Sequence, residues 1–556
     1  MHCIEQATLF SRSRIWQLQR DYFNQAGINA WRSGEVPHYI TSNPVMGKTY
    51  AELVLALLRD LSLKGHTEEP VYLLELGAGH GRLCYHFFKH FEKFYNNSAM
   101  PLPPFCYVLS DFTETNLDFW RGHPRLQPYY DKGWLDYCLY DVESTTNLNL
   151  QYSNKQIQPN SLVQPILAVG NYFLDTIPQD LFKVENGTLS HTLLSLHSET
   201  NVAQEANKEQ KTETENSDQE GSAAQKIDTL HLEYAYHPIS DTELAYEDEP
   251  ELNRLLETYR ETLSDSHVLL PHIGLRCLTR LQNLSQQGLV LLTADKGEHH
   301  LSNLDHNPAP GLVTHGSFSL TVNYHALQQV CTNKGGLALF PLHQQASLDL
   351  GCLLFLPDAH SFIETRNAYE RFVADYGPDD YFSLKKLVEP SFETANYRDI
   401  LAVTRLSGCD ARIFVQMLPR LFEILPTISD NERWNLLRLI PKLWDTYYPL
   451  AEADDFADDL GNVLMTLHFF NEAILYFEQS INIYGTTGDG LYKIALCQCL
   501  TGEVKAAAGN VKHLLKANPN EEALQALVAL IDEFELEVDI AFESEVKSEV
   551  ELEPDG

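Results

Sequence analysis

The segment Val71-Tyr-Leu-Leu-Glu-Leu-Gly-Ala-Gly-His-Gly81-Arg82 sets the architecture that we expect for this chain. Residues 71–74 and Leu76 form an apolar run typical of a buried strand, and residues 82–94 carry leucine and phenylalanine at helical spacing. Glycines at alternate positions between them allow positive φ and close approach of a ligand, while the helix N-terminus presents unpaired N–H groups to negative charge. The pattern predicts a strand, a ligand-binding glycine turn and a helix.

The spacing of the glycines separates two classes of cofactor. A dinucleotide fingerprint would place its third glycine at position 82, where this chain has Arg82. Glu75, two residues before the first glycine, is placed to receive the ammonium group of a bound amino acid. This combination favours S-adenosylmethionine, whose methionyl end carries an ammonium, over NAD or FAD. A tight turn that binds no ligand is the alternative.

Length, composition and charge limit the class of protein. A chain of 556 residues with 44% hydrophobic residues is expected to form two or three domains. Its net charge of −37 argues against nucleic acid or an anionic membrane as the main partner and favours a basic protein or peptide. No apolar run approaches the roughly 18 residues of a membrane span, and residues 1–20 lack the apolar core of a signal peptide. We therefore expect a cytoplasmic protein with reduced cysteines.

Strand patterns alternate with helical patterns through about residue 360, which argues for an α/β sheet. Residues 198–227 contain almost no large apolar side chain and are predicted to form a disordered insertion. This insertion separates two largely alternating runs, residues 189–196 and 229–236, that are expected to pair as a hairpin. Further strands are predicted at 105–110, 165–170, 288–295, 317–323 and 351–356.

The C-terminal part of the chain has helical patterns only. Between residues 391 and 534, the segment around Ala473 is echoed around Ala507, an offset of 34 residues that is the period of a tetratricopeptide helix pair. Any two amphipathic helices give partial self-similarity, and a stable stack usually needs at least three repeats. Residues 535–556 are predicted to be an acidic, solvated tail. The expected domains are thus 1–390 and 391–534.

Several segments, in order, resemble the MidA-type family of S-adenosylmethionine-dependent methyltransferases, which includes a mitochondrial arginine methyltransferase involved in respiratory complex I assembly. The resemblance spans roughly residues 15–355. It is carried by Tyr22-Phe23 with His38-Tyr-Ile-Thr-Ser-Asn-Pro44, by the cofactor turn at Leu74–Leu83, by Val108-Leu-Ser-Asp111, by Gly170-Asn-Tyr-Phe-Leu-Asp-Thr-Ile-Pro178, and by Asp295-Lys-Gly297 with Ser319-Leu-Thr-Val-Asn323.

The resemblance implies an α/β fold with a Rossmann-like class I methyltransferase sheet and inserted β segments, followed by an all-α helical repeat domain. The backbone of Gly77, Gly79 and Gly81 would cradle the cofactor, and Glu75 would organise its amino end. Asp111 would accept hydrogen bonds from the ribose hydroxyls, and Asp141 would lie near the adenine. Ordinary capping of strand ends is the alternative for both aspartates.

Two further residues are candidates for binding the methyl acceptor. Asn171 and Asp175 follow an apolar strand, at the sheet edge where open α/β folds bind their ligands. If the acceptor is an arginine, as the resemblance implies, Asp175 would orient the guanidinium through paired hydrogen bonds. A turn or N-cap role before Pro178 is the alternative. No metal site is predicted, because His299, His300 and His306 lie among loop-forming residues.

The chain departs from the family pattern at three positions. Tyr172 replaces an acidic residue, Lys296 replaces an aromatic one, and Asn43 separates Ser42 from Pro44. The sequence predicts a methyltransferase acting on a protein side chain, with a helical repeat that recruits the target. The rival hypothesis is a catalytically silent methyltransferase fold that acts as a scaffold, and a small-molecule methyltransferase is a third. The chain lacks a convincing Gly-x-Ser-x-Gly elbow or Gly-Lys-Ser phosphate loop.

Overall fold

The structure is a computed structural model that describes residues 2–198, 227, 229–240, 242–315, 317–343, 345–450, 452, 454–517 and 522–533. The chain divides into two units, Met1–Leu387 and Val388–Gly556. Two segments predicted to be disordered, 198–227 and 535–556, lie outside the described residues except for Ser198 and Ile227.

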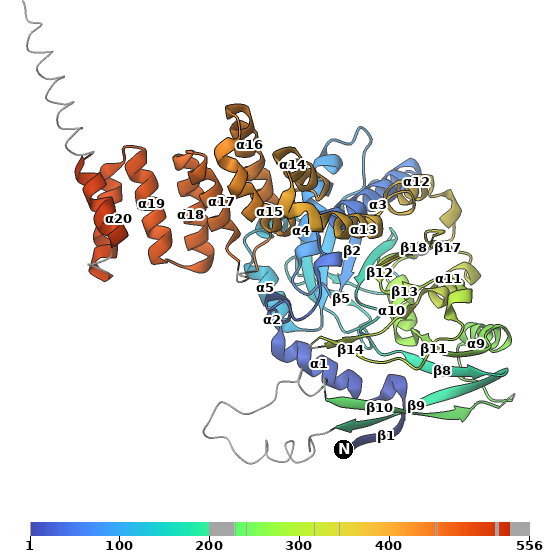
Figure 1. The fold of residues 1–556 in the computed structure, drawn as a ribbon. Helices are drawn as coiled ribbons and strands as arrows, with labels where there is room; N and C mark the ends of the chain where they lie inside the picture. The colour runs from blue at the N-terminus through green and yellow to red at the C-terminus, as the bar shows by residue number, and fades with distance from the viewer. Residues whose placement is uncertain are drawn as a thin grey trace, which may run out of the picture. The chain divides into compact units, whose positions relative to one another are not determined.

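A seven-stranded sheet forms the centre of the first unit, in the order β17-β18-β12-β7-β2-β3-β4 (Figure 1). Its five successive strands from β12 to β4 are parallel, whereas β18 runs antiparallel to β12 and β17 antiparallel to β18. The predicted α/β sheet is therefore confirmed. The strands are β2 (Val71–Leu76), β3 (Phe105–Asp111), β4 (Leu135–Leu139), β7 (Ile166–Asn171), β12 (Leu289–Asp295), β17 (Leu337–Leu339) and β18 (Asp349–Phe355).

The order of the strands reverses between β2 and β7. From β2 the chain proceeds through β3 to β4 on one side, and then returns to place β7 and β12 on the other. Such a reversal leaves a crevice outside the carboxyl ends of the two central strands, where open α/β sheets bind ligands. Leu76 pairs with Gly170 in the register of β2 and β7, so Gly77 and Asn171 emerge together at this edge.

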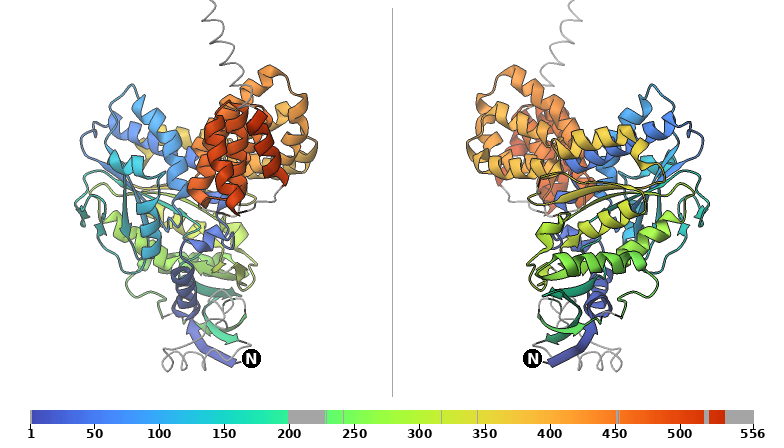
Figure 2. Two further views of the ribbon diagram at one scale, coloured as in Figure 1. Left: turned by 90° about the vertical axis from the view of Figure 1, so that its left-hand side faces the viewer. Right: turned by 90° about the vertical axis from the view of Figure 1, so that its right-hand side faces the viewer.

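Apolar side chains on both faces explain why the parallel strands are buried. On one face, the ring of Phe87 from α4 (Arg82–Asn96) lies 5.7 Å from Phe105 and 5.2 Å from Tyr107. On the other face, Val108 belongs to a core cluster with Leu278 of α10 (His272–Gln282). Helices thus cover both faces of the sheet (Figure 2). The other helices of this unit are α1 (Ile15–Ala26), α2 (Asn29–Arg32), α3 (Pro44–Leu63), α5 (Glu114–Gly122), α6 (Gln127–Asp131), α9 (Pro250–Thr262), α11 (Tyr324–Asn333), α12 (Ile363–Tyr369) and α13 (Pro378–Val388).

A second, antiparallel sheet of five strands contains the predicted hairpin. In it, Leu230 pairs with Ser198 and Pro238 with Ser190, so the two alternating runs do pair. The sheet also contains a strand at the very start of the chain that the sequence analysis did not predict. Its members are β1 (His2–Leu9), β8 (Asp180–Glu185), β9 (Thr188–Ser198), β10 (Leu230–Pro238) and β11 (Asp265–Leu270).

The predicted strand at 317–323 is broken into β15 (Ser317–Ser319) and β16 (Val322–Asn323). Neither joins the seven-stranded sheet: β15 pairs with β14 (Val313–His315), and β16 with β13 (Gly297–Glu298). The break occurs at Leu320, whose N–H donates to the backbone oxygen of Asp175 instead of to a strand partner. Each pair is thus a small two-stranded sheet, and Ser317 and Ser319 of β15 face the crevice. A further one joins β5 (Leu148–Asn149) to β6 (Gln156–Ile157).

The described residues of the second unit form helices and the turns between them, and no strand. Ala473 and Ala507, one predicted repeat apart, are both fully buried. Phe477 and Val511, also 34 residues apart, are buried in the same two helices. Its helices are α14 (Tyr397–Leu406), α15 (Ala411–Ile424), α16 (Asp430–Thr446), α17 (Phe456–Thr466), α18 (Phe470–Tyr484), α19 (Gly488–Leu500), α20 (Val504–Ala517) and residues 522–533.

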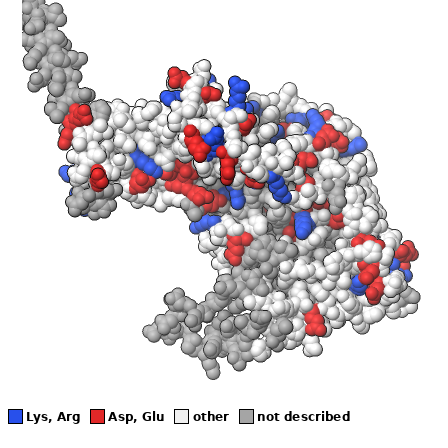
Figure 3. All heavy atoms as spheres, in the orientation of Figure 1, with Lys and Arg blue, Asp and Glu red and all other residues white. Residues whose placement is uncertain are grey.

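Acidic and basic side chains are interspersed on the face drawn in Figure 3, and lysines and arginines do not gather there into one patch. None of the described helices is long and apolar enough to cross a membrane.

Candidate functional site

A cavity of about 310 Å³ opens at the carboxyl ends of β2, β3 and β7 in the first unit. Its walls include Gly77 of the glycine turn, Asp111 at the end of β3 and Asn171 at the end of β7. Residues of α1 and of the segment before α3 also line it. The cavity therefore occupies the crevice that the strand order predicts.

The three glycines of the turn all have the left-handed backbone that side chains disfavour. Their φ angles are +63° at Gly77, +53° at Gly79 and +74° at Gly81. A Cβ on Gly79 would also lie only 2.8 Å from the ring of Trp31. Gly77 and Gly79 line the cavity, whereas Gly81 is the N-cap of α4 behind it. The turn thus needs glycine for its conformation and, at Gly79, for space.

Asp111 organises the turn from the neighbouring strand. Its carboxylate accepts hydrogen bonds from the backbone N–H groups of Gly79 at 3.2 Å and Thr113 at 3.0 Å, and from the side chain of Asn116 at 3.1 Å. Burial raises the pKa of Asp111 above its ordinary value, although these three donors oppose the shift. The side chain is 6% exposed and lines the cavity. An acceptor of hydroxyl hydrogen bonds is therefore held in place there.

Glu75 is a buried carboxyl group in the cavity wall. The hydroxyl of Tyr107 donates a hydrogen bond to it at 2.8 Å. Burial raises the pKa of Glu75 to about 8, and the nearby charge of Asp111 adds to the effect of burial. No lysine or arginine among the described residues forms an ion pair with Glu75. A cationic ligand would supply the missing countercharge.

Asp141 lies beside the cavity and not in its wall. Tyr140 and Val142 line the cavity on either side of it. The Asp141 carboxylate forms an ion pair of 2.7 Å with Arg20 of α1 and accepts the N–H of Glu143. The structure therefore places Asp141 where it positions Arg20, which does line the cavity.

Asn171 is held at the end of β7 by contacts with two elements. The hydroxyl of Tyr50 donates to its Oδ1 at 2.5 Å, and its own Nδ2 donates to the backbone oxygen of Thr41 at 3.4 Å. Both Asn171 and Thr41 line the cavity. Asn43, which interrupts the family pattern nearby, is the N-cap of α3 and accepts the N–H groups of Val45 and Met46.

Asp175 also lines the cavity, on the turn that follows β7. This turn contains Tyr172 with φ of +48°, an uncommon conformation for a bulky residue. Asp175 is 3% exposed, and its Oδ1 has no hydrogen-bond partner among the described residues. Burial and the neighbouring carboxyl group of Asp295 raise the pKa of Asp175 well above its ordinary value. The structure thus brings Asn171 and Asp175 into one wall, along with Tyr172 and Lys296.

The N-terminal segment contributes a wall that the sequence analysis did not predict. Trp31 stacks on Phe23 with ring centroids 5.9 Å apart and meets the edge of His80 at 5.8 Å. All three line the cavity, as do Trp16 and Arg20 of α1. The aromatic residues at helical spacing in α1 were the available signal, because an amphipathic helix must pack against something. Periodicity alone does not say against which part of the fold.

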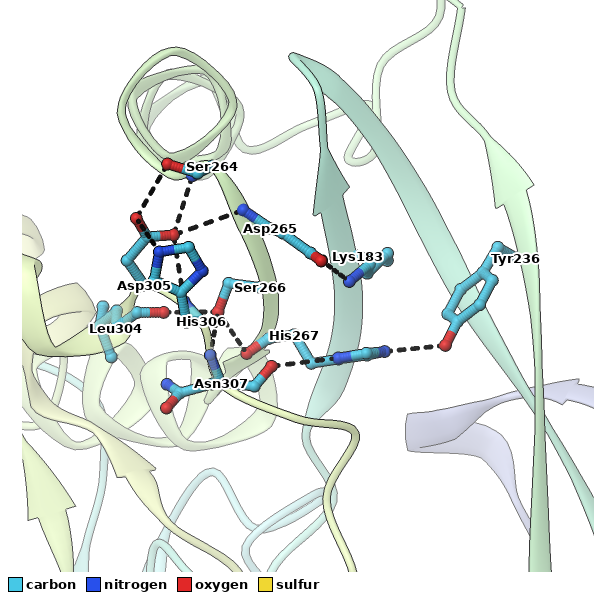
Figure 4. Close-up of polar contacts among 10 residues, drawn as sticks. All are labelled: Lys183, Tyr236, Ser264, Asp265, Ser266, His267, Leu304, Asp305, His306 and Asn307. Atoms are coloured by element: carbon cyan, nitrogen blue, oxygen red, sulfur yellow. Dashed lines mark hydrogen bonds and ion pairs between the residues drawn. The ribbon is translucent and has the colours of Figure 1, made fainter.

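The histidines considered for a metal have separate partners. His299 contacts Asp349 at 2.7 Å and the backbone oxygen of Pro341 at 3.0 Å. His306 lies 3.6 Å from Asp305, whose carboxylate accepts both the N–H and the hydroxyl of Ser264 (Figure 4). Figure 4 also shows the neighbouring His267, which bonds to Tyr236 and to the backbone of Asn307. These contacts connect the loop 304–307 to β11.

The comparisons with known proteins gave structural matches only. No family model matches the chain, and no curated protein matches it. Two solved structures from Burkholderia thailandensis match with TM-scores of 0.35, each over 66% of this chain. One is an uncharacterized ACR, COG1565 superfamily protein, 12% identical over 82% of its length. The other is a COG1565 superfamily member bound to S-adenosyl-homocysteine, 13% identical over 83% of its length. At this level of similarity, function has to be inferred from the cavity's own residues.

Proposed function

We propose that the first unit is an S-adenosylmethionine-dependent methyltransferase. The observation that carries the proposal is the glycine turn between β2 and α4, with positive φ at Gly77, Gly79 and Gly81, bound to the Asp111 carboxylate at the edge of the cavity. A backbone free of Cβ atoms next to fixed carboxylates suits a ligand with a cationic amino end and a hydroxyl-bearing ribose.

The side chains around the turn fit the two ends of this cofactor. Glu75, buried and without a countercharge among the described residues, would bind the methionyl ammonium. Asp111 would accept hydrogen bonds from the ribose hydroxyls. When bound, S-adenosylmethionine supplies an activated methyl group on a positively charged sulfur, so the protein's main task is to position the acceptor and exclude water.

The acceptor is proposed to be a protein side chain, with arginine favoured by the family resemblance. Asn171 and Asp175 share one wall with the turn and would hold the nucleophile. A carboxyl group with a buried, unpartnered oxygen supports this role for Asp175, because a guanidinium donates hydrogen bonds to such an oxygen. The cytoplasmic location expected from the sequence is part of this proposal.

We also propose that the helical second unit recruits the protein substrate, as a tetratricopeptide-like stack would. The 34-residue spacing of the buried pairs Ala473 with Ala507 and Phe477 with Val511 supports this architecture. The net charge of −37 favours a basic protein or peptide as the partner. Methyl transfer to a small molecule would need no such unit.

A catalytically silent scaffold remains the second candidate function, and two residues favour it. Tyr172 and Lys296, which depart from the family pattern, both lie in the cavity wall at the acceptor end. Calorimetric titration of the full chain with S-adenosylmethionine tests the proposal against the scaffold. Micromolar binding that is lost in Gly79 and Asp111 variants would support the enzyme, whereas a folded protein that binds no S-adenosylmethionine would leave the scaffold as the better account.

A further inference from the structure

Two buried carboxyl groups meet behind the acceptor end of the cavity. Asp175 lies on the turn after β7 and lines the cavity, whereas Asp295, the last residue of β12, is 0% exposed and lies behind it. The register of the parallel strands pairs Ala294 with Asn171, which brings the two strand ends side by side. The carboxylate of Asp295 accepts the N–H of Phe173, in the turn that carries Asp175, and a side-chain hydrogen bond to Asp295 is among the causes that raise the pKa of Asp175. Two carboxyl groups can share a hydrogen bond only if one of them carries a proton.

The partners of the two groups differ. Asp295 accepts the N–H of Phe173 at 3.1 Å and the hydroxyl of Tyr324 at 3.2 Å, so its position is fixed by two other elements. Oδ1 of Asp175 is buried and has no hydrogen-bond partner within the part of the chain that the structure describes. Leaving a buried acceptor unpaired has a free-energy cost in a folded protein. A donor from a bound ligand would remove this cost.

We propose that Asp175 and Asp295 act as one carboxyl pair that takes a proton from the nitrogen atom being methylated. The inference rests on the methyltransferase function proposed for this cavity. It adds Asp295 as a positioning and proton-accepting partner that acts through Asp175. It also defines the substrate class as a cationic nitrogen, an ammonium or a guanidinium.

The proton transfer balances without any further reactant. The N–H bond of the acceptor breaks and its proton binds Oδ1 of Asp175, while the proton between the carboxyl groups moves to Asp295. The pair then carries two protons and no charge, and the nitrogen keeps its electron pair. That electron pair would then attack the methyl group that S-adenosylmethionine supplies when bound, and the electrons of the broken C–S bond would stay on sulfur. The second proton leaves to solvent after the product departs.

The chemistry of possible acceptors favours nitrogen. Amines and guanidines hold their protons at neutral pH, with ordinary pKa values of about 10 and above 12, so they need a base before they attack. A carboxylate or thiolate acceptor has no proton to give up, and the negative charge of the pair would repel it. Lysine and arginine side chains are attracted by that same charge.

Burial raises the pKa of Asp295 to about 7, so the pair is poised to accept a second proton near neutral pH. Like-charge repulsion keeps both groups from ionising together. Neither aspartate forms an ion pair with a lysine or arginine among the described residues. The titratable groups that surround the pair from the packed elements are Tyr50, Glu75, Tyr172, Lys296, Tyr324 and Asp349.

Carboxyl-carbon NMR of the full chain labelled with [4-13C]aspartate tests this inference without a known substrate. Asp175→Asn and Asp295→Asn each remove one aspartate line from the spectrum, which assigns that line to the replaced residue. One variant that folds is enough to assign one of the two lines. In the unmodified protein we expect both lines to titrate far above the ordinary aspartate value, with Asp295 near pH 7. In Asp295→Asn, the Asp175 line should titrate at lower pH, because the like charge is gone and the new amide can donate to it.

Ethylguanidinium chloride serves as the probe cation. Adding it at pH 8 should shift the Asp175 and Asp295 lines together, because the two carboxyl groups share one proton. Asp180 provides a partly buried control: although burial opposes the shift, hydrogen bonds from His272, Ser11 and Tyr246 hold the pKa of Asp180 below its ordinary value. The Asp180 line, assigned with Asp180→Asn, should titrate below the ordinary aspartate pKa and should not shift when ethylguanidinium is added.

Two results would overturn the inference. One is an Asp175 line that titrates near the ordinary aspartate value in the unmodified protein, and the other is a probe that leaves this line unmoved. If S-adenosylmethionine binds in either case, the methyltransferase proposal stands and the carboxyl pair alone fails. If S-adenosylmethionine does not bind, the methyltransferase proposal fails whatever the carboxyl titration shows.

Discussion

The carboxylate of Asp111 accepts a hydrogen bond of 3.2 Å from the backbone N–H of Gly79, the middle glycine of the turn. Asp111 ends β3, whereas Gly79 follows β2, so the bond joins the carboxyl ends of two neighbouring strands. It fixes the conformation of the turn before any ligand binds. The same carboxylate also accepts from Thr113 and Asn116, which hold it from its own strand end and from α5.

Replacing Asp111 by asparagine should weaken S-adenosylmethionine binding roughly 10- to 100-fold, because hydrogen bonds to a charged group contribute about 1.5–3 kcal/mol. The asparagine amide would also point a donor at N–H groups that are donors themselves. Calorimetric titration measures the affinity, and thermal unfolding of the same samples measures stability. A variant that binds as tightly as the unmodified protein would remove Asp111 from the cofactor site.

Asp136 provides the matched control for this substitution. It is 2% exposed, lies on the adjacent strand β4, and accepts the backbone N–H groups of Tyr137, Tyr152 and Ser153. It does not line the cavity. Asp136→Asn should therefore lower the free energy of unfolding by about 1–3 kcal/mol and leave the affinity for S-adenosylmethionine unchanged.

A methyl group on Gly79 should weaken cofactor binding more than it destabilises the fold. Gly79→Ala forces an alanine into φ of +53° and places its Cβ 2.8 Å from Trp31, so the ring that lines the cavity must move. Gly133 has φ of +68° and open space around it, so Gly133→Ala carries only the backbone strain of about 1–2 kcal/mol. Equal loss of S-adenosylmethionine affinity in both alanine variants would argue against a cavity effect.

The affinity for S-adenosylmethionine should rise as the pH is raised from about 6 to 8. Burial raises the pKa of Glu75 to about 8, and the ammonium of the ligand favours the ionised form, so binding at lower pH must release a proton. Calorimetry in buffers of different ionisation enthalpy measures this release. In Glu75→Gln the release should be absent, which separates ionisation of the protein from that of the ligand. Release that persists in Glu75→Gln would assign the proton to another group.

The same shift in the pKa of Glu75 has a defined sign for the stability of the free protein. The folded state binds this proton more tightly than the unfolded state, whose glutamate has the ordinary value of 4.5. Between about pH 4.5 and pH 8 the contribution of Glu75 to the free energy of unfolding therefore falls as pH rises. Glu75→Gln should remove this part of the slope, as measured by urea unfolding at several pH values.

The predictable parts of the fold are those with local signals. The glycine turn, its flanking strand and helix, and the alternation of strands and helices each follow from patterns within a dozen residues or so. The α/β sheet could therefore be predicted, and so could the hairpin of β9 and β10. The placement of Asn171 beside Gly77 followed from the general rule that ligands bind at the carboxyl edge of such sheets.

The parts that escaped prediction depend on long-range contacts. The wall formed by Trp31 and α1 meets residues far along the chain, and so does β1, which pairs with β9. The prediction of a single strand at 317–323 was wrong, because the N–H of Leu320 bonds to the backbone oxygen of Asp175 and not to a neighbouring strand. Asp295 was not predicted as a site residue, because its position near Asp175 depends on the register of β12 with β7.

The second unit offers a test that leaves the cavity untouched. A Cβ on Gly461 of α17 would lie 2.4–2.9 Å from the ring of Phe477 on α18, so Gly461→Ala should force these helices apart and lower the stability of this unit by about 1–3 kcal/mol. Gly509 is also helical but has open space, so Gly509→Ala should stabilise α20 by roughly 0.5–1 kcal/mol. Neither substitution should change S-adenosylmethionine affinity, since the described residues that line the cavity all belong to the first unit. If the helices recruit the substrate, Gly461→Ala should no longer capture a protein substrate but should still bind the cofactor. Unchanged capture by a variant whose helical unit has melted would assign recruitment to the first unit.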